Sequence, residues 1–337
     1  MDKKDEIILQ QLETIRTMTE RNLRSMGGDF WGTPFENVTG APEKKPAAAQ
    51  PAEKKADEPE PLPKENLADL QAELDSYIGL ADVKEEVKNL INMVNVYKLR
   101  RAHDLPTTDM SLHMVFTGNP GTGKTMMARM MARIYRSLDI LSKGQLVEVD
   151  RSGLVAGYVG QTALKTQKVI EKAMGGVLFI DEAYALNGKS ENDFGQEAID
   201  TILKAMEDHR DDLVVIVAGY TDLMEKFIHS NPGLESRFNR FLLFEDYSPD
   251  EMLAIFRMQC KKGCYQLAEG TEELVRDYIN EENGDPETFG NARGVRNCFE
   301  HILVAQNNRL AAMESVTKDD LMTIIPDDVL YARGKLD

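Results

Sequence analysis

Eight consecutive residues have the types and spacing that bind phosphate groups. The run Gly118-Asn119-Pro120-Gly121-Thr122-Gly123-Lys124-Thr125 fits the pattern G-x-x-x-x-G-K-S/T. Glycines let the backbone wrap closely, so that its N–H groups face the phosphates, and the helix start that follows adds a positive dipole end. We therefore assign Asn119 to Thr125 to nucleotide binding, with Lys124 reaching the β- and γ-phosphates and Thr125 binding Mg²⁺.

Two adjacent carboxylates form the second candidate group. Asp181 and Glu182 follow the apolar run Leu178-Phe179-Ile180, and Asp181 lies 56 residues after Thr125 (181 − 125 = 56). Asp181 would hold the Mg²⁺ shell, and Glu182 would orient and polarise the attacking water. Both acids together favour hydrolysis over transfer to a small molecule, because kinases of this loop class usually need no water-polarising glutamate.

Apolar strands alternate with helices around these residues. The strand SLHMVFTG (111–118) leads into the phosphate loop, and the helix TMMARMMARIYRSL (125–138) follows it. Four more strands are expected in QLVEVD (145–150), GGVLFIDEA (175–183), DLVVIVAGY (212–220) and RFLLFEDY (240–247). Continuous apolar runs are typical of parallel strands covered on both faces. The order predicts an α/β fold with a parallel sheet over residues 67–247.

After Tyr247 the sequence predicts helices only. Ser248 is placed as a helix cap, with Pro249 at the first helical position and Glu251 at the third. Further helices are expected in TEELVRDYI (271–279), in residues 292–311 and in TKDDLMTII (317–325). The result is a small all-helical domain over residues 248–337.

The N-terminal part has a different character. Residues 1–26 contain an amphipathic helix over 3–26, whose apolar stripe could dock on the main body, pair with another copy or bind an adaptor. Residues 27–66 are rich in Pro, Ala, Lys and Glu without apolar periodicity, which predicts a semi-extended, disordered linker.

Composition narrows the class of protein. The chain has 337 residues, with 57 Asp and Glu against 40 Lys and Arg and a net charge of −17. Nonspecific nucleic-acid binding neutralises phosphates with basic surface, so this balance argues against nucleic acid as the main partner. The start MDKKDEIILQ has no apolar core of a signal peptide, and no apolar run reaches about 18 residues. We expect a cytoplasmic protein with no membrane association.

Three cysteines, an odd and sparse set, do not form a disulfide framework. Cys260 and Cys264 lie four residues apart in an expected helix and would share a face. We expect both to be reduced thiols without a zinc site.

About residues 67–335 resemble an AAA+ ATPase module, in which a sheet domain with Walker A and Walker B motifs precedes a helical lid. More narrowly, several motifs resemble the group that contains the red-type Rubisco activase and stage V sporulation protein K. These motifs are GNPGTGKT, LVAGYVGQTA, GGVLFIDEAYAL, DFGQEAIDTILKAMED, VVIVAGY, NPGLESRF and FGNARGVRN. The resemblance implies ATP and Mg²⁺ as ligands.

The resemblance also implies a pore loop. Tyr158-Val159-Gly160 matches the pattern of aromatic, hydrophobic and glycine residues that grips an extended polypeptide in ring-shaped members. A large flat side chain on a Gly-flanked loop can contact any peptide. The alternative is a turn whose tyrosine packs inward.

Arg237, in GLESRF, matches the arginine finger that enters the neighbouring subunit's site and stabilises charge on the γ-phosphoryl group. Arg240 could share or take that role. The alternative is that these arginines are surface residues paired to Glu235 or Glu245.

Arg293, in GNARGVRN, matches the sensor 2 residue of the lid, and Arg296, one helical turn along, is the second candidate. Ile78 and Gly79 match the stretch that contacts adenine in the family.

The position of sensor 1 departs from the common family pattern, which has a small polar residue, often Asn, at the end of the fourth strand. Here Tyr220 falls nearest that place, and Thr221 or Asp222 could serve instead. A phenol could orient water.

Together these features predict an ATP-hydrolysing protein-remodelling motor that assembles into a ring, hexameric by family analogy. Its substrate is a protein, and the helix over 3–26 would recruit substrate or partner. The alternatives are an ATP-dependent assembly scaffold or switch without threading and, against the acidic charge and the pore loop, a DNA-processing AAA+ ATPase.

Overall fold

The structure is a computed structural model that describes residues 61–107, 111–158, 160–188 and 193–335. The predicted helix over 3–26 and the linker up to residue 60 lie outside these described residues. The first described helices are α2 (Leu67–Ser76) and α3 (Ala81–Ala102). Between them Gly79 (φ +63°) and Leu80 (φ +58°) both adopt the left-handed conformation, and this turn separates the two helices.

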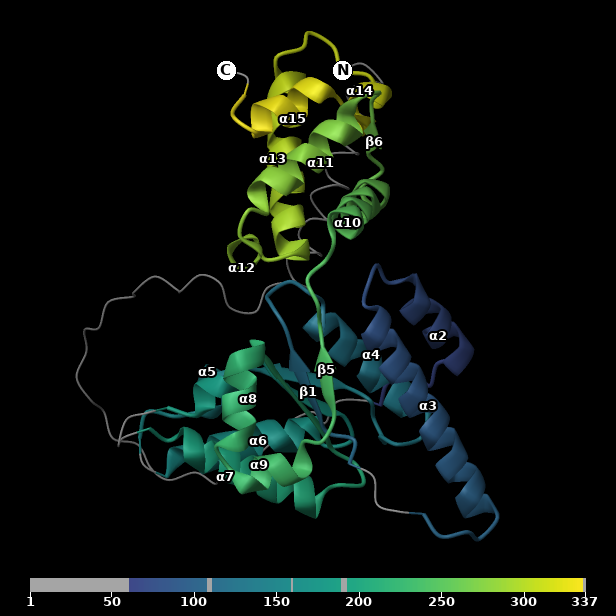
Figure 1. Cartoon of the computed structure of the whole chain (residues 1–337), viewed down its shortest axis with the longest axis vertical. Coiled ribbons are helices and arrows are strands. Elements are labelled where there is room, and N and C mark those ends of the chain that lie inside the picture. The colour runs from purple at the N-terminus through teal and green to yellow at the C-terminus, as the bar shows by residue number, and fades with distance from the viewer. Residues whose placement is uncertain (1–60, 108–110, 159, 189–192, 336–337) are drawn as a thin grey trace, which may run out of the picture. The chain divides into compact units, whose positions relative to one another are not determined.

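The five predicted strands form one parallel sheet in the order β2-β3-β4-β1-β5 (Figure 1). Their bounds are β1 (Met114–Thr117), β2 (Leu146–Val149), β3 (Val177–Ile180), β4 (Val214–Gly219) and β5 (Phe241–Leu243). The three central strands β1, β3 and β4 are buried at every position, which explains why their sequences are continuously apolar.

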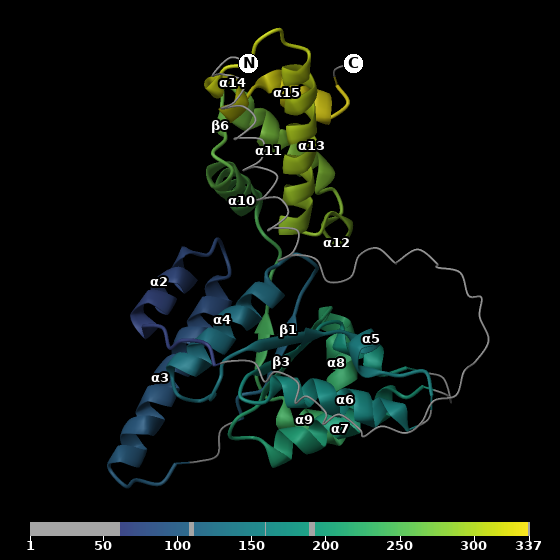
Figure 2. The ribbon, with the colours of Figure 1, turned by 180° about the vertical axis from the view of Figure 1, so that it is seen from behind.

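Helices cover both faces of the sheet (Figures 1 and 2). Phe116 and Phe179 point to the face covered by α2, α3 and α4 (Lys124–Ser137). Val115 and Leu178, one residue before them, point to the opposite face. That face is covered by α5 (Arg151–Leu154), α6 (Gln161–Ala173), the short helix η1 (Ala183–Leu186), α7 (Gly195–Asp208), α8 (Thr221–His229) and α9 (Pro232–Arg237). Each fully buried large apolar side chain contributes roughly 1.5–3 kcal/mol, so both layers hold the strand ends in place.

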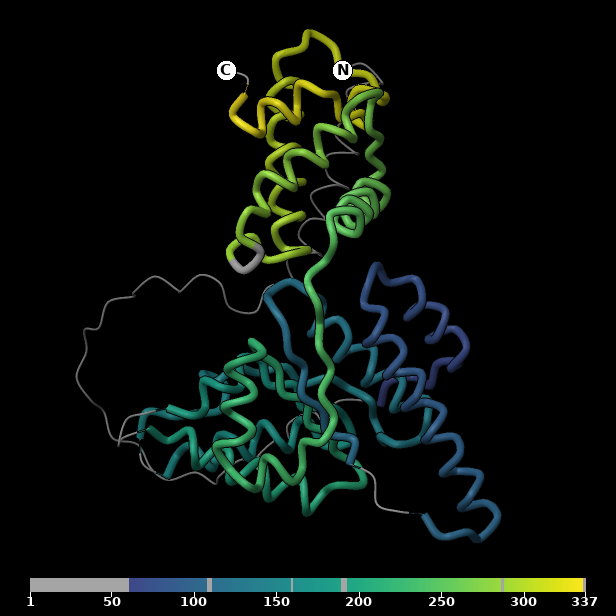
Figure 3. The backbone as a smooth tube through the Cα atoms, viewed as in Figure 1, coloured from purple at the N-terminus to yellow at the C-terminus, as the bar shows by residue number. Residues whose placement is uncertain are grey.

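After β5 the chain enters a helical lid (Figure 3). The lid has its own apolar core. Its helices are α10 (Pro249–Lys262), α11 (Thr271–Glu282), α12 (Pro286–Phe289), α13 (Ala292–Ala311), α14 (Lys318–Met322) and α15 (Pro326–Ala332). The predicted cap of α10 is confirmed, because the Ser248 hydroxyl accepts from Glu251 N while the Glu251 carboxylate accepts from Ser248 N.

One expectation about the lid was wrong. It is not all-helical, because β6 (Gln266–Leu267) and β7 (Thr323–Ile324) pair in parallel. The predicted helix over 317–325 therefore ends at Met322, where the β-branched residues Thr323, Ile324 and Ile325 favour extended backbone. Two-residue strands are too short to leave an alternating pattern in the sequence.

The prediction that Cys260 and Cys264 share a helix face was also wrong. Helix α10 ends at Lys262, and Cys264 adopts a left-handed turn (φ +59°) and is exposed, while Cys260 is buried. Both thiols, and that of Cys298, are free.

An ion pair between the partly exposed Arg309 and a buried carboxylate holds the C-terminal end of the lid. The Asp328 carboxylate is 1% exposed and accepts from Arg309 Nε at 2.7 Å and Nη2 at 3.0 Å. We expect Arg309→Ala to lower the free energy of unfolding by about 3–5 kcal/mol, because it leaves a buried carboxylate unpaired. Urea unfolding measures this, with Arg276→Ala as the control. The ion pair of Arg276 with Asp250 is exposed at both residues, so Arg276→Ala should lower the free energy of unfolding by about 1 kcal/mol or less. Equal losses would contradict the prediction.

No helix within residues 61–107, 111–158, 160–188 or 193–335 combines the length and apolar content that a membrane span requires.

Candidate active site

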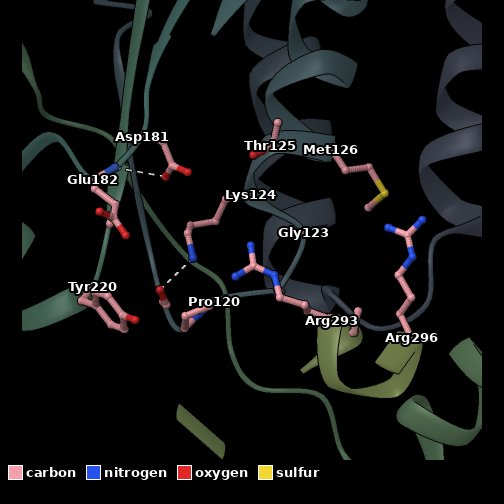
Figure 4. A pocket seen from close by; sticks show the side chains of 14 residues that line it. Pro120, Gly123, Lys124, Thr125, Met126, Asp181, Glu182, Tyr220, Arg293 and Arg296 are labelled. Atoms are coloured by element: carbon pink, nitrogen blue, oxygen red, sulfur yellow. Dashed lines mark hydrogen bonds between the residues drawn. The ribbon is translucent and has the colours of Figure 1, made fainter. Parts of the chain in front are cut away.

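An open cavity of about 440 Å³ lies at the carboxyl ends of β1, β3 and β4 (Figure 4). Carboxyl ends of neighbouring parallel strands meet at one edge, where α/β proteins bind their ligands. The cavity brings together residues of the sheet domain and of the lid that the sequence singled out separately. These are Pro120, Gly121, Gly123, Lys124, Thr125, Asp181, Glu182, Tyr220, Arg293 and Arg296.

The phosphate loop follows β1 directly and turns tightly. Gly118, Gly121 and Gly123 have φ values of +137°, +73° and +98°, a region that favours glycine. A Cβ atom at Gly118 would overlap the carbonyl oxygen of Phe244. Thr122 is fully buried, and its hydroxyl donates to Asn119 O at 2.8 Å. The glycines therefore form a narrow backbone cradle of the kind that accepts phosphate.

Lys124 lies at the centre of the cavity, where its Nζ donates to Gly118 O at 2.8 Å and to Asn119 O at 2.7 Å. The pKa of Lys124 is lowered to about 8, mainly by burial and also by the charge of Arg293, while the charges of Asp181 and Asp246 act in the opposite direction. An anion bound in the cradle would favour the charged ammonium. The lysine therefore fits a phosphate group chemically as well as geometrically.

The two acids stand together at the end of β3. Asp181 Oδ1 accepts from Glu182 N at 3.1 Å. Glu182 adopts left-handed backbone (φ +48°, ψ +43°), uncommon for a residue with a side chain, immediately before η1. Figure 4 shows both carboxylates on one side of Lys124 and the Arg293 guanidinium on the other. Carboxylate and hydroxyl oxygens are ligands that Mg²⁺ accepts, so Asp181 and Thr125 fit a magnesium ion.

Tyr220 and the two lid arginines complete the walls of the cavity. Tyr220 immediately precedes α8, and its ring centroid lies 6.2 Å from that of Tyr184. Arg293 and Arg296 come from the first turns of α13, and Arg296 Nε lies 3.3 Å from Glu300 Oε1. Of the three candidates for sensor 1, Tyr220 is the one that lines the cavity.

Ile78 and Gly79 do not line this cavity. Ile78 packs against the lid core. A Cβ atom at Gly79 would lie 3.1 Å from the Tyr247 ring and 2.7 Å from the Glu251 carboxylate. Their contact with adenine stays a prediction.

Arg237 and Arg240 also lie outside the cavity of their own chain. Arg240 is used internally, since its Nε donates to Ser111 O at 3.1 Å and its Nη2 lies 3.5 Å from Met93 Sδ. Arg237 Nη2 bonds exposed Glu207 at 3.2 Å, rather than the Glu235 or Glu245 considered from the sequence, and its buried Nε has no partner among the described residues. The Ser111 hydroxyl donates to Arg237 O at 2.8 Å, so both arginines are anchored to the segment that begins β1.

Tyr158 is 73% exposed, so it does not pack inward. It lies in the connection between α5 and α6, and Gly160 (φ +74°) caps the start of α6. Val159 lies outside the described residues. The base of the loop is fixed by Ala156 N, which donates to Thr162 Oγ1 at 3.0 Å.

Two polar residues beside the cavity, Asn291 and Asp246, were not predicted from the sequence to belong to the site. Asn291, immediately before α13, is fully buried and bonds Asp246, which in turn bonds Asn119 of the phosphate loop. Asn291 stands within the motif FGNARGVRN, which could have drawn attention to it, whereas nothing around Asp246 marks it.

Comparison with protein families finds two adjoining matches. Residues 114–246 match the ATPase family associated with various cellular activities (AAA), and residues 248–336 match the AAA lid domain. The two matches cover the sheet with its phosphate loop and the lid.

Comparison with curated proteins finds relatives that share most of their length with this chain. Rubisco activase, chloroplastic, of Cyanidioschyzon merolae is 44% identical over 272 residues, which are 80% of this chain and 92% of that protein. Plasmid-encoded CbxX of Cupriavidus necator is 42% identical and covers 86% and 92%, respectively. Stage V sporulation protein K of Bacillus subtilis is 40% identical and covers 78% and 82%.

Among solved structures, the AAA domain of FIGL-1 superposes with a TM-score of 0.55 at 18% identity, over 78% of this chain and 83% of that one. At this identity the likeness concerns the fold alone. The family matches and the curated relatives, taken with the cavity, show that this chain belongs to the AAA family of ATPases, in the group that includes Rubisco activase of Cyanidioschyzon merolae, CbxX and stage V sporulation protein K.

Proposed function

We propose that this ATPase is a ring-forming motor that remodels a protein by pulling on its chain through Tyr158. The observation that carries the proposal is the position of Tyr158, a large aromatic side chain that is 73% exposed on a glycine-flanked connection. An exposed tyrosine contributes nothing to the core, whereas it can grip an extended polypeptide by its flat ring.

In this proposal the cavity residues divide the work of hydrolysis. The loop from Asn119 to Thr125 binds the phosphates, and Lys124 neutralises their charge. Thr125 and Asp181 would hold Mg²⁺, which when bound would supply further charge neutralisation at the phosphate oxygens. Glu182 orients and polarises the attacking water, and Tyr220 assists in its orientation.

Arginines would come to this site from two directions. Arg293, with Arg296 beside it, reads the γ-phosphate from the lid of the same chain. Arg237 enters from the neighbouring subunit, because it lies outside its own cavity and its guanidinium bonds the exposed Glu207 and, at 3.4 Å, Gly233 O of its own helix, whereas Arg240 is tied to Ser111 O at the start of the sheet. Activity therefore requires assembly, which by family analogy is a hexameric ring. Each subunit would consist of a large domain (67–247) and a lid (248–337).

Arg151 would transmit a structural change at the site of hydrolysis to the pore loop. It opens α5, the helix that leads to Tyr158. Its Nη1 donates to Ala185 O in η1, and its Nη2 bonds Asp193, each at 2.7 Å. Because η1 begins immediately after Glu182, a movement of that segment on hydrolysis would be passed to α5 and the loop.

The substrate is proposed to be a protein, recruited by the helix over 3–26 or by a partner bound there. One relative is named Rubisco activase and another is named for sporulation, so their names point to different processes. Rubisco is accordingly one protein to test, beside a generic unfolded chain such as casein.

We expect Tyr158→Ala to abolish the change in ATP turnover that added casein or Rubisco causes, because the ring loses its grip on the chain. Basal turnover and assembly should stay within about twofold of the unmodified protein, since Tyr158 lies outside the cavity. Steady-state turnover with and without each protein measures this. Tyr331→Ala, at a tyrosine of the lid that is 47% exposed, is the matched control and should respond normally.

A normal response by Tyr158→Ala would contradict threading and favour the assembly scaffold, which needs ATP binding but no grip. Stimulation of turnover by DNA in place of protein would favour a DNA-processing ATPase.

A further inference from the structure

Asn291 is a fully buried polar side chain where the phosphate loop, the start of α13 and the segment entering α10 meet. Its Oδ1 accepts from Tyr247 N at 2.9 Å. Its Nδ2 donates to Asp246 Oδ1 at 2.7 Å and to Pro120 O at 3.3 Å. A side-chain amide has two donor hydrogens and an acceptor oxygen, and these contacts use all of them.

Asp246 and the backbone add further contacts to the phosphate loop. The two Asp246 oxygens lie 3.1 and 2.9 Å from Asn119 Nδ2, which donates to them. Ala292 N donates to Gly121 O at 3.3 Å, and a Cβ at Gly121 would overlap Gly290 O. The beginning of α13 is thus held directly on the loop.

The backbone at Asn291 indicates that this arrangement is imposed by its surroundings. Its φ of +53° with ψ of −125° lies outside the regions that residues with side chains prefer. Such a conformation persists where neighbouring contacts fix it. Arg293 follows two residues later and lines the cavity, whereas Asn291 does not.

We propose that Asn291 is a positioning residue that, with Asp246, fixes Arg293 and the start of the lid helix against the phosphate loop, and so links nucleotide occupancy to the placement of the lid. The inference rests on the proposed roles of the phosphate loop and Arg293. Asn291 does not line the cavity, and it acts through Pro120 and Arg293.

Charged groups lie near this cluster on several of the elements that meet there. Lys124 comes from the phosphate loop and α4, and Arg293 comes from α13. Asp82 of α3, Glu245 beside Asp246, and Glu251 of α10 line a neighbouring pocket with Asp246. Burial raises the pKa of Tyr247 to about 12, so it stays neutral near neutral pH. The pKa of Lys124 is lowered to about 8, so each variant is compared with the unmodified protein at the same pH.

The test uses Asn291→Asp, which places a carboxylate opposite that of Asp246 where a 2.7 Å hydrogen bond now stands. Two such groups take up a shared proton at a higher pH than an isolated carboxyl does. We expect kcat for ATP at about pH 7.5 to fall about tenfold or more, with KM changed by less than about threefold. At about pH 6 the shared proton restores a donor, so the deficit relative to the unmodified protein should narrow.

The exchange variant Asn291→Asp with Asp246→Asn again pairs an amide with a carboxylate. It should recover most of the lost kcat and lose the extra pH dependence, although Pro120 O still lacks its donor. Asn297→Asp, the same change at an exposed position of α13, is the control and should match the unmodified protein at both pH values. Urea unfolding at each pH separates kinetic from folding defects.

The inference is overturned if folded Asn291→Asp shows the same deficit at both pH values and the exchange variant is no faster. Should Asn291→Asp fail to fold, the exchange variant carries the test: recovered turnover supports the inference, and a folded but inactive protein overturns it. Arg293→Ala separates the two proposals. Unchanged turnover there would remove the role proposed for Arg293, whereas the pH test would still report on the link between Asn291 and the phosphate loop.

Discussion

Glu182→Gln is expected to lower ATP turnover by about 10²- to 10⁴-fold while ATP binding is retained. The amide has the size of the carboxylate but cannot accept the water proton. The hydrogen bond of Glu182 to Asp181 is made by its backbone N–H, so the substitution leaves it in place. The binding contacts of the phosphate loop therefore remain, and the ATP-bound state should accumulate.

The mass of the Glu182→Gln protein in solution, with and without Mg·ATP, measures that accumulation alongside turnover. We expect a shift to a closed oligomer when Mg·ATP is added. Glu314→Gln, at an exposed residue after α13, is the control and should hydrolyse normally. A Glu182→Gln protein that turns over ATP at the normal rate would remove the proposed role of this residue, and one that binds ATP as a monomer would remove the ring.

Arg237→Ala is expected to lower turnover by about 10³-fold or more, because an arginine supplied in trans stabilises the charge of the transferred phosphoryl group. ATP binding should persist, since Arg237 lies outside the cavity of its own chain. Arg240→Ala should instead reduce stability, because its guanidinium bonds Ser111 O within the subunit. ATP turnover, ATP affinity and urea unfolding are measured on both variants. Together they identify which of the two arginines acts as the arginine finger.

Mixing two inactive proteins tests the trans arrangement directly. Glu182→Gln subunits carry Arg237, and Arg237→Ala subunits carry Glu182, so some interfaces of a mixed ring regain a complete site. Turnover should therefore exceed the sum of the two separate proteins and pass through a maximum near equal amounts. An arginine acting within its own chain predicts no recovery at any ratio.

The sheet and the phosphate loop could be predicted because their physical causes are local in the sequence. Strand β3 is buried on both faces and therefore continuously apolar, and the glycines of the loop are required by positive φ angles within the loop itself. The cap of α10 is equally local, since Ser248 and Glu251 satisfy each other over three residues.

The missed features depend on residues that are distant in the chain. Asn119, Asp246 and Asn291 meet only after the sheet and the lid have formed, and each alone has the polarity of an ordinary loop residue. Strands β6 and β7 are only two residues long, and they lie far apart in the sequence of the lid. Neither hydrophobic periodicity nor residue type predicts such contacts, because they form only when the fold brings distant residues together.

Strand β1 has the phosphate loop at one end and the anchor of Arg237 and Arg240 at the other. Its four residues span about 13 Å, and the strand is buried throughout. In a ring of the proposed kind, one end would serve its own catalytic centre and the other the neighbour's. Such a strand would be a rigid link between consecutive catalytic centres, and in a closed ring these links would connect all the centres. Strain that nucleotide binding imposes at one catalytic centre would pass through β1 to the next and so around the ring. The order in which the subunits hydrolyse ATP would then be a property of the whole ring and not of any one subunit.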